Sequence, residues 1–325
     1  MPGLLYTYIL FPKQNIQTMK RKKKIILITF TALIIQLFLI AFILLPYFVM
    51  GQILDTKVRF SRVFTPEEFG ITATPLSVQT VDGLKISAFE VKSEQPTKAV
   101  ILCLSGIHNP SVTAFYGHAK MFKEHGYSSI LIDMRAHGES EGEQICAGYK
   151  EYLDVDAVVD YVKEQPSYHN VPIIVMGLSL GGATAINAIA NNEHIDALIS
   201  LSAFSSWEEA FRDNMAMSLP HWLANLLSPF VDVATELKYG DATSIKPIYS
   251  ISQLGQRPAL LIHSREDSQV PYPHFKRLLQ NAPKGTDTLT VEGDNHLITD
   301  HFTIPENDSI YSHTLLKFIS SAVGR

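Results

Sequence analysis

VPIIVMGLSLGG, residues 171–182, is the stretch that decides how this chain folds. An unbroken apolar run, typical of a strand buried on both faces, leads into Gly-x-Ser-x-Gly and then into a helix-forming segment, residues 183–191. This order predicts a strand, a sharp turn and a helix, with the Ser179 hydroxyl raised above the end of a sheet. Glycine suits positions 177 and 181 because a side chain there would collide where the strand and the helix pack closely. Ser179 is therefore a candidate nucleophile.

Strand-like and helix-like segments alternate on both sides of this turn. Residues 76–91 predict a hairpin with Asp82-Gly83 as its two-residue turn. Further strands are predicted at 99–104, 129–133, 197–201, 259–263 and 286–291, and helices at 114–125, 149–164, 274–281 and 310–319. Continuous apolar strands that alternate with helices indicate an α/β fold, with a mainly parallel sheet covered by helices on both faces.

One segment breaks the alternation. Residues 205–254 separate two consecutive predicted strands by far more than an ordinary loop, and they are rich in helix formers and apolar side chains. Such an insert at the edge of an α/β sheet predicts a helical lid over the site, although the same side chains also suit packing down on the sheet.

The N-terminal part of this chain of 325 residues has a different character. Residues 25–50 contain no charged residue, and only Thr29, Thr31 and Gln36 interrupt the apolar run. This length predicts a transmembrane helix. The basic cluster at 20–24 precedes it, so we expect the N-terminus in the cytoplasm and everything after the span on the external side of the cell membrane. A cleaved signal peptide is the alternative, but the exit from the span is bulky and lacks a small-residue cleavage site.

The net charge of −5 conceals an asymmetry between the two ends. Six basic and no acidic residues precede the predicted span, so the remainder must carry −11 for the total to be −5. An acidic domain argues against nucleic acid as a partner, and against docking on anionic headgroups by charge alone. Cys103 and Cys146 are too few for a disulfide framework and lack the spacing of a metal site, although a single bridge between them stays open.

The predicted nucleophile needs a base within hydrogen-bond reach, and the base needs an acid that holds its tautomer. In a strand–turn–helix site of this kind the order along the chain is serine, acid, histidine. Asp267 and His296 each follow a predicted strand, in that order, with Glu266 and His301 as their nearest competitors. Parallel strands bring their carboxyl ends to one edge, so the sequence predicts a triad of Ser179, Asp267 and His296.

The oxyanion formed during acyl transfer needs hydrogen-bond donors. One is the backbone N–H of Leu180, directly after the nucleophile, and the other belongs to the loop after the first buried strand. That loop begins Ser105-Gly106-Ile107-His108, and we assign the second donor to the N–H of Ile107. Gly106 allows substrate to approach the backbone closely. His108 is expected to be a solvated loop histidine rather than a substrate contact.

These residues resemble the α/β-hydrolase family, and most closely its serine-hydrolase branch of monoacylglycerol-lipase-like, serine-aminopeptidase-like (S33) and Bem46-like enzymes. The resemblance covers residues 76–325. It rests on DMRAHGESEG at 133–142, GLSLGG at 177–182, LIHSREDSQVP at 261–271, whose Val-Pro favours Asp267 over Glu266, and the late His296. The family usually has His-Gly where this chain has Ser105-Gly106, and Gly before the acid where this chain has Ser264.

The resemblance implies a serine hydrolase that needs no metal and no organic cofactor. With the predicted anchor and the apolar insert, we expect a membrane-anchored enzyme that cleaves carboxylic ester or thioester bonds of lipid-like or acyl substrates. Two alternatives stay open. One is an aminopeptidase-like peptidase, in which Glu208, Glu209 or Asp213 would hold the substrate amine, and the other is a non-catalytic binder of a small molecule.

The expected organisation has four parts. A cytoplasmic basic segment at 1–24 precedes the span at 25–50, a tether at 51–75 follows, and the hydrolase domain occupies 76–325 with its lid insert at about 205–254. Met19 stands directly before the basic cluster and is an alternative start to Met1.

Overall fold

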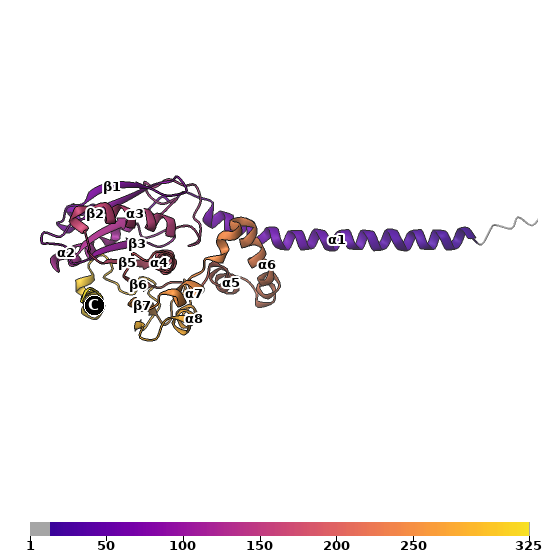
Figure 1. The fold of residues 1–325 in the computed structure, drawn as a ribbon. Helices are drawn as coiled ribbons and strands as arrows, with labels where there is room; N and C mark the ends of the chain where they lie inside the picture. The colour runs from indigo at the N-terminus through magenta and orange to yellow at the C-terminus, as the bar shows by residue number, and fades with distance from the viewer. Residues whose placement is uncertain (1–13, 325) are drawn as a thin grey trace, which may run out of the picture.

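The computed structural model describes residues 14–324, with side chains from residue 18 onward (Figure 1). Within these residues eight strands form one sheet, in the order β1-β2-β4-β3-β5-β6-β7-β8. β2 pairs antiparallel with β1 and with β4, and every other pair is parallel, as the sequence predicts. The strands are β1 Thr74–Gln79, β2 Lys85–Val91, β3 Val100–Leu104, β4 Ser128–Ile132, β5 Ile173–Leu178, β6 Ala197–Leu201, β7 Ala259–Ser264 and β8 Asp287–Val291.

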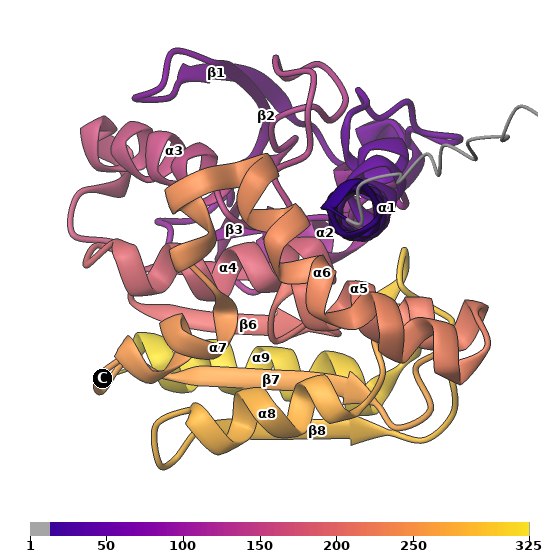
Figure 2. The same cartoon turned by 90° about the vertical axis from the view of Figure 1, so that its right-hand side faces the viewer.

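Helices cover both faces of the sheet (Figure 2). Alternate side chains of each buried strand point to opposite faces, so Val100, Leu102 and Leu104 of β3 enter one apolar cluster while Ile101 and Cys103 enter the other. The first cluster packs against α3 (Tyr152–Glu164), α4 (Leu180–Asn191) and α8 (Pro273–Asn281), and the second against α2 (Tyr116–Glu124) and α9 (Ser309–Val323). Short 3-10 turns lie at Pro66–Phe69, Val112–Phe115, Pro166–Tyr168, Gly240–Ser244, Ile251–Gln253 and Pro305–Asn307.

Both cysteines are free and buried, so the bridge that the sequence left open does not form. Cys103 lies in the centre of β3, and burial raises the pKa of its thiol far above the usual range. Burial likewise raises the pKa of the Cys146 thiol, to about 12. Both residues therefore act as small apolar side chains.

The hairpin differs in detail from the sequence prediction. The structure has a three-residue loop, Val81–Gly83, in place of the expected two-residue turn, because Thr80 N–H pairs with the Leu84 carbonyl at 2.9 Å. Gly83 takes the left-handed backbone (φ +90°) that such a bulged loop requires. The Asp82 carboxylate turns inward and accepts a 2.8 Å hydrogen bond from Arg135 Nη1.

The insert between β6 and β7 is helical, as predicted. It contains α5 (Trp207–Ser218), α6 (His221–Tyr239) and the short α7 (Pro247–Ser250). Figure 1 shows α5 and α6 at the end of the domain from which α1 leaves. Trp207 and Phe211 of α5 line the same cavity as Ser179, so the insert covers the serine end of the sheet.

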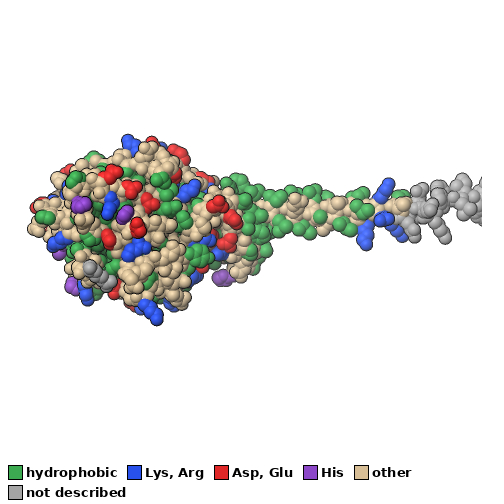
Figure 3. All heavy atoms as spheres, viewed as in Figure 1, with side chains coloured by type: hydrophobic (Ala, Val, Ile, Leu, Met, Phe, Trp, Pro, Cys, Tyr) green, Lys and Arg blue, Asp and Glu red, His purple; other side chains and the backbone are tan. Residues whose placement is uncertain are grey.

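A single helix, α1 (Gln14–Leu54), contains the predicted span and continues beyond it. Residues 18–54 are long and apolar enough to cross a membrane. Figure 3 shows hydrophobic side chains along the projecting part of α1, with basic side chains near its far end. This exposed apolar surface is typical of a lipid-facing helix rather than a core helix.

The first part of the segment predicted as a tether, residues 51–75, continues α1 to Leu54 and packs against the domain. Met50 and Leu54 are fully buried in the core, and Val58 is nearly so. The Leu54 carbonyl accepts the Ile145 N–H at 2.8 Å, and Val58 N–H donates to the Ala136 carbonyl at 2.7 Å. The helix thus enters the core of the domain without a flexible linker.

Candidate active site

Ser179 stands at the turn between β5 and α4 in a strained backbone conformation. Its φ of 57° and ψ of −117° lie outside the regions that L-residues favour, and its N–H donates to the Leu201 carbonyl at 2.8 Å. A Cβ on Gly177 would lie 2.0 Å from the Gly181 carbonyl oxygen, and one on Gly181 would lie 2.5 Å from the Leu104 carbonyl oxygen. Both glycines are therefore required for the strand and helix to meet at this turn.

Asp267 and His296 meet in a buried pair beyond the ends of β7 and β8. His296 Nδ1 lies 2.8 Å from Asp267 Oδ2. The other carboxylate oxygen, Oδ1, accepts the backbone N–H groups of Gln269 and Val270, each at 2.9 Å. Oδ1 therefore fixes the carboxylate to its own loop, and Oδ2 orients the imidazole.

Opposing effects act on the Asp267 carboxyl. Burial by itself raises its pKa, but the hydrogen bond and charge of His296, together with the Val270 and Gln269 N–H groups, lower the pKa below the ordinary value. The carboxyl is therefore ionised at neutral pH. An ionised acceptor holds the proton of the histidine on Nδ1 and leaves Nε2 free to act as a base.

The competitors of these residues lie elsewhere. Glu266 and His301 are exposed, whereas Asp267 and His296 are buried. Ser179, Asp267 and His296 follow β5, β7 and β8, which lie side by side with β6 in one parallel run. The Ser179 hydroxyl makes no hydrogen bond within residues 18–324.

Ser202 and Ser264 hold the histidine loop, a role that the sequence analysis missed. Ser202 N–H donates to the Ile262 carbonyl at 2.9 Å, while its hydroxyl donates to the His296 carbonyl at 2.8 Å. Ser264 Oγ donates to the Asn295 carbonyl at 2.6 Å. These bonds fasten the loop to the ends of β6 and β7. A serine directly after each predicted strand, 197–201 and 259–263, was the only signal for them in the sequence.

The two proposed oxyanion donors flank Ser179. Leu180 is the first residue of α4, so its N–H has no acceptor within the helix. The loop with Ile107 passes so close that a Cβ on Gly106 would lie 3.6 Å from Ser179 Cβ. The Ile107 carbonyl lies 2.8 Å from His137 Nε2. The backbone N–H of Ile107 makes no hydrogen bond within the part of the chain that the structure describes.

A cavity of about 250 Å³ opens beside Ser179, between the serine turn and the lid. We call it the serine pocket. Its lining is mainly apolar and comes from the oxyanion loop, the lid and, unexpectedly, Ile53 near the end of α1. His108 also lines it, and its Nε2 lies 3.1 Å from the Ile53 carbonyl oxygen. His108 is therefore a half-buried contact to α1 rather than the solvated histidine that we expected.

The acidic residues considered for binding an amine are already paired. Glu208 lies 2.6 Å from Lys246 Nζ, and Glu209 lies 3.1 Å from Arg277 Nη1. Asp213 lies 3.1 Å from His274 Nε2. The hydrogen bond and charge of His274, together with the charges of Arg277 and Arg212, lower the pKa of the Asp213 carboxyl although burial raises it. None of the three carboxylates lines the serine pocket.

A second serine–histidine–aspartate arrangement occurs at the base of the lid. Ser205 Oγ lies 2.7 Å from His274 Nδ1, and Asp213 lies on the opposite side of the same ring. Ser205 is fully buried and also pairs with Glu209 of α5. This network joins α5 to α8 and has no access to substrate. Within the described residues, no cluster of histidine, cysteine or acidic side chains is arranged to hold a metal ion.

Comparison with known proteins agrees with this architecture. A family model described as serine aminopeptidase, S33, matches residues 95–251. The chain is 26% identical to protein bem46 of Schizosaccharomyces pombe, over 76% of this chain and 81% of that protein. It is 27% identical to thiohydrolase aneE of Aspergillus aculeatus, over 67% and 68%. An uncharacterized membrane protein of Saccharomyces cerevisiae, YNL320W, is 24% identical over 70% and 75%.

Solved structures show the same fold. The esterase Pf2001 of Pyrococcus furiosus superposes with a TM-score of 0.64 at 21% identity, over 82% of this chain and 98% of the esterase. The chain therefore has the α/β-hydrolase fold, and the family match and the relatives support a hydrolase of the serine-aminopeptidase (S33) branch.

Proposed function

We propose that this protein is a membrane-anchored serine hydrolase that cleaves carboxylic ester or thioester bonds through Ser179, His296 and Asp267. The observation that carries the proposal is the buried 2.8 Å pair of His296 Nδ1 and Asp267 Oδ2, which follows β7 and β8 in the same parallel run whose β5 leads to the strained turn of Ser179. Such an arrangement is recognised by its geometry and roles rather than by sequence position.

The catalytic cycle follows from these positions. His296 Nε2 takes the proton of the Ser179 hydroxyl as the oxygen attacks the substrate carbonyl, and Asp267 stabilises the imidazolium that forms. The N–H groups of Leu180 and Ile107 stabilise the resulting oxyanion. The imidazolium then gives its proton to the leaving alcohol or thiol, which departs and leaves an acyl-enzyme. Water, activated by His296, releases the acid.

An ester or thioester suits the pocket better than a peptide. The serine pocket is mainly apolar, and the acids that would bind a substrate amine are paired with Lys246, Arg277 and His274. A thiohydrolase and an esterase among the similar proteins support the same choice. We infer that the substrate is lipid-like or carries an acyl chain.

Membrane attachment rests on α1. Its apolar side chains are exposed from residue 25 to residue 40, and the basic cluster lies at the N-terminal end of this surface. Positive charge favours the cytoplasmic side, so the catalytic domain is placed on the external side of the cell membrane. The naming of a yeast relative as a membrane protein supports attachment.

The test is active-site labelling of the full-length protein in detergent with a fluorophosphonate, followed by turnover of a panel of esters, thioesters and aminoacyl amides. We expect wild type to label, Ser179→Ala not to label, and esters and thioesters to be cleaved. Equal labelling of Ser179→Ala would overturn the assignment of the nucleophile. Cleavage of aminoacyl amides alone would instead favour a peptidase.

A further inference from the structure

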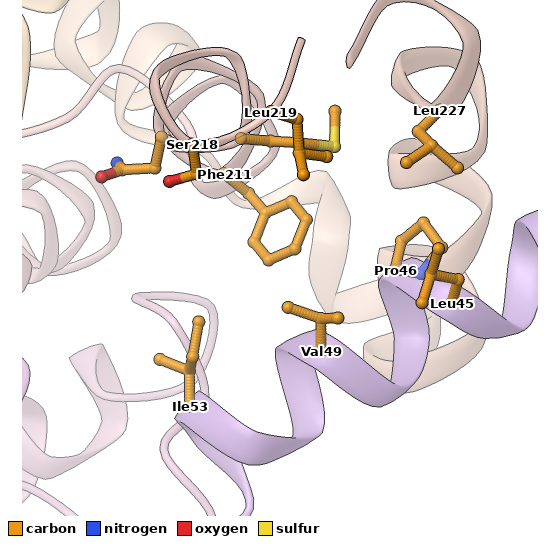
Figure 4. Close-up of a pocket in the computed structure, with 10 residues that line it drawn as sticks. Leu45, Pro46, Val49, Ile53, Phe211, Ser218, Leu219 and Leu227 are labelled. Carbon is orange, nitrogen blue, oxygen red and sulfur yellow. The ribbon is translucent and has the colours of Figure 1, made fainter. Parts of the chain in front are cut away.

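A second cavity lies next to the serine pocket, between α1 and the lid. It has a volume of about 320 Å³, and Figure 4 shows side chains of α1 and of the lid pointing into it from opposite sides. Its lining is almost entirely apolar. The lining residues are Leu45, Pro46, Val49 and Ile53 of α1, Phe211, Asn214, Met215 and Ser218 of α5, Leu219 after it, and Leu227 of α6. We call this space the anchor cavity.

The anchor cavity adjoins the serine pocket. Ile53, Phe211 and Asn214 line both spaces, so these side chains form a wall that the two cavities share. Ile107 and Leu180, the proposed oxyanion residues, also line the serine pocket. A ligand whose carbonyl lies at Ser179 therefore has an apolar direction in which to extend, past Ile53 and Phe211 along α1.

The other end of the anchor cavity reaches the apolar surface of α1. Leu45 and Val49 line the cavity, yet about half of the Leu45 side chain is exposed. The lid continues this surface with Met217, Trp222 (69% exposed), Leu226 and Leu237. Figure 3 shows hydrophobic side chains passing from α1 onto the adjoining end of the domain. An exposed apolar surface of this kind marks a site of contact with lipid or protein, and its continuity with the proposed span favours lipid.

The walls of the anchor cavity are held in place. The rings of Phe42 and Phe230 stack with their centroids 5.6 Å apart, which joins α1 to α6. Lys238 of α6, whose side chain is 2% exposed, pairs with Asp55 directly after α1. The cavity is thus a built feature between two fixed helices rather than a gap beside a mobile tether.

We propose that the anchor cavity binds the acyl chain of a bilayer lipid ester, which enters from the membrane along α1 and places its carbonyl at Ser179. The proposal rests on the function proposed above and names its substrate class. It also gives the anchor helix a direct part in the site, because Val49 and Ile53 contact the chain. Membrane attachment then determines which molecules reach the serine as well as where the enzyme resides.

The volume sets the length of chain that the anchor cavity accepts. An apolar cavity of about 150 Å³ holds benzene, so the anchor cavity has room for roughly twice as many carbon atoms, about a dozen. Burial of each methylene strengthens binding by about threefold to fourfold. For monomeric esters in water, kcat/KM is expected to rise at about that rate per carbon from the acetyl to the octanoyl ester.

The first experiment compares acetyl and octanoyl p-nitrophenyl esters on the full-length protein in detergent. Val49→Trp places an indole in the anchor cavity and is expected to lower the octanoyl-to-acetyl ratio of kcat/KM at least tenfold. Leu44→Trp is the matched control, because Leu44 lies on the same helix, is 41% exposed and does not line the cavity. It should keep the wild-type ratio. A wild-type ratio in Val49→Trp would overturn the proposal.

Leu227→Trp fills the same cavity from the lid and is a second variant in case Val49→Trp does not fold. Fluorophosphonate labelling of each variant reports whether the serine turn is intact. If the wild-type protein did not react with the fluorophosphonate, the proposed function itself would be refuted. Normal labelling with an unchanged chain-length preference in Leu227→Trp would refute only the acyl site.

The second experiment tests the source of the lipid. Full-length protein is reconstituted in vesicles of a dialkyl (ether-linked) phosphatidylcholine, which has no carboxylic ester to cleave. Dodecanoyl glycerol in these vesicles is diluted with the same lipid at constant bulk concentration. Entry from the bilayer predicts a rate that falls with the mole fraction of substrate in the vesicle. A rate that stays constant would show that the ester enters from water, and would overturn entry along α1.

Discussion

Replacement of Asp267 by asparagine tests the proposed triad most sharply. The change keeps the size of the side chain and removes its charge. One oxygen must still accept the N–H groups of Gln269 and Val270, both 2.9 Å from Oδ1. The new amide NH2 would then face His296 Nδ1 at the position of Oδ2, which lies 2.8 Å away in the native protein. Two donors cannot pair, so the ring is expected to move its proton to Nε2.

The magnitude follows from the role of that proton. A histidine protonated on Nε2 cannot accept the proton of the Ser179 hydroxyl, and the corresponding exchange in a serine protease triad lowers kcat by about 10⁴-fold. We expect a similar loss in Asp267→Asn, which corresponds to about 5.4 kcal/mol in the activation free energy. Because the two backbone N–H groups keep an acceptor, the loop should retain its conformation. Kinetics with a soluble butyryl ester and thermal unfolding measure these two effects separately.

Glu266→Gln is the matched control. Glu266 adjoins Asp267 and was its competitor in the sequence, but it is exposed. We expect this variant to retain wild-type kcat. If Asp267→Asn retained more than a tenth of the wild-type kcat, the assignment of the orienting acid would be wrong. The same conclusion would follow if Glu266→Gln were the more damaging change.

Three further predictions concern stability. Gly177→Ala places a methyl group 2.0 Å from the backbone oxygen of Gly181 and is expected to cost at least about 3 kcal/mol, measured as a loss of folded, labelled protein. Leu54→Ala, in the fully buried end of α1, should cost about 2–5 kcal/mol in thermal unfolding of the full chain, whereas the exposed Leu44→Ala should cost less than about 0.5 kcal/mol. Burial lowers the pKa of His118 to about 3, so the unfolded chain takes up this proton first and stability falls as pH drops from about 6.5 toward 3. Urea titrations at several pH values measure the free energy of unfolding, and His118→Gln should reduce its decline by up to about 1.4 kcal/mol per pH unit. An unchanged decline would contradict the conclusion that His118 is buried in its neutral form.

The sheet and the serine turn could be predicted because their signals are local. β5 and the Gly-x-Ser-x-Gly turn are contiguous in sequence, and each buried strand is an uninterrupted apolar run. The observed strands begin and end within three residues of the predicted positions. The candidate acid and base could be named because strand ends collect at one edge, but the bond from Ser202 to His296 joins residues 94 positions apart and has no local pattern.

The docking of α1 could not be predicted, for a different reason. Met50 and Leu54 pack into the core, whereas Leu44 and Phe48 are exposed, yet all four are apolar residues within or next to one hydrophobic run. Side chains that face lipid and side chains that face a protein core have the same composition, so no periodicity separates them. The ion pair of Asp55 and Lys238 spans 183 residues and appears only when the lid has folded. The anchor cavity that results from this docking could therefore not be predicted from the sequence.

The unbroken entry of α1 into the core has a mechanical consequence. A bilayer core of about 30 Å is spanned by about 20 helical residues, and the apolar side chains of α1 are exposed from residue 25 to residue 40, before the helix packs on the lid. In the proposed membrane-anchored state the helix is therefore expected to stand upright in a thick bilayer and to tilt in a thin one. Because Met50 and Leu54 are buried in the domain, that tilt rotates the whole domain with the helix. Membrane thickness would then set the angle at which the enzyme faces the lipid surface, and one sequence would present its serine differently to thin and thick bilayers.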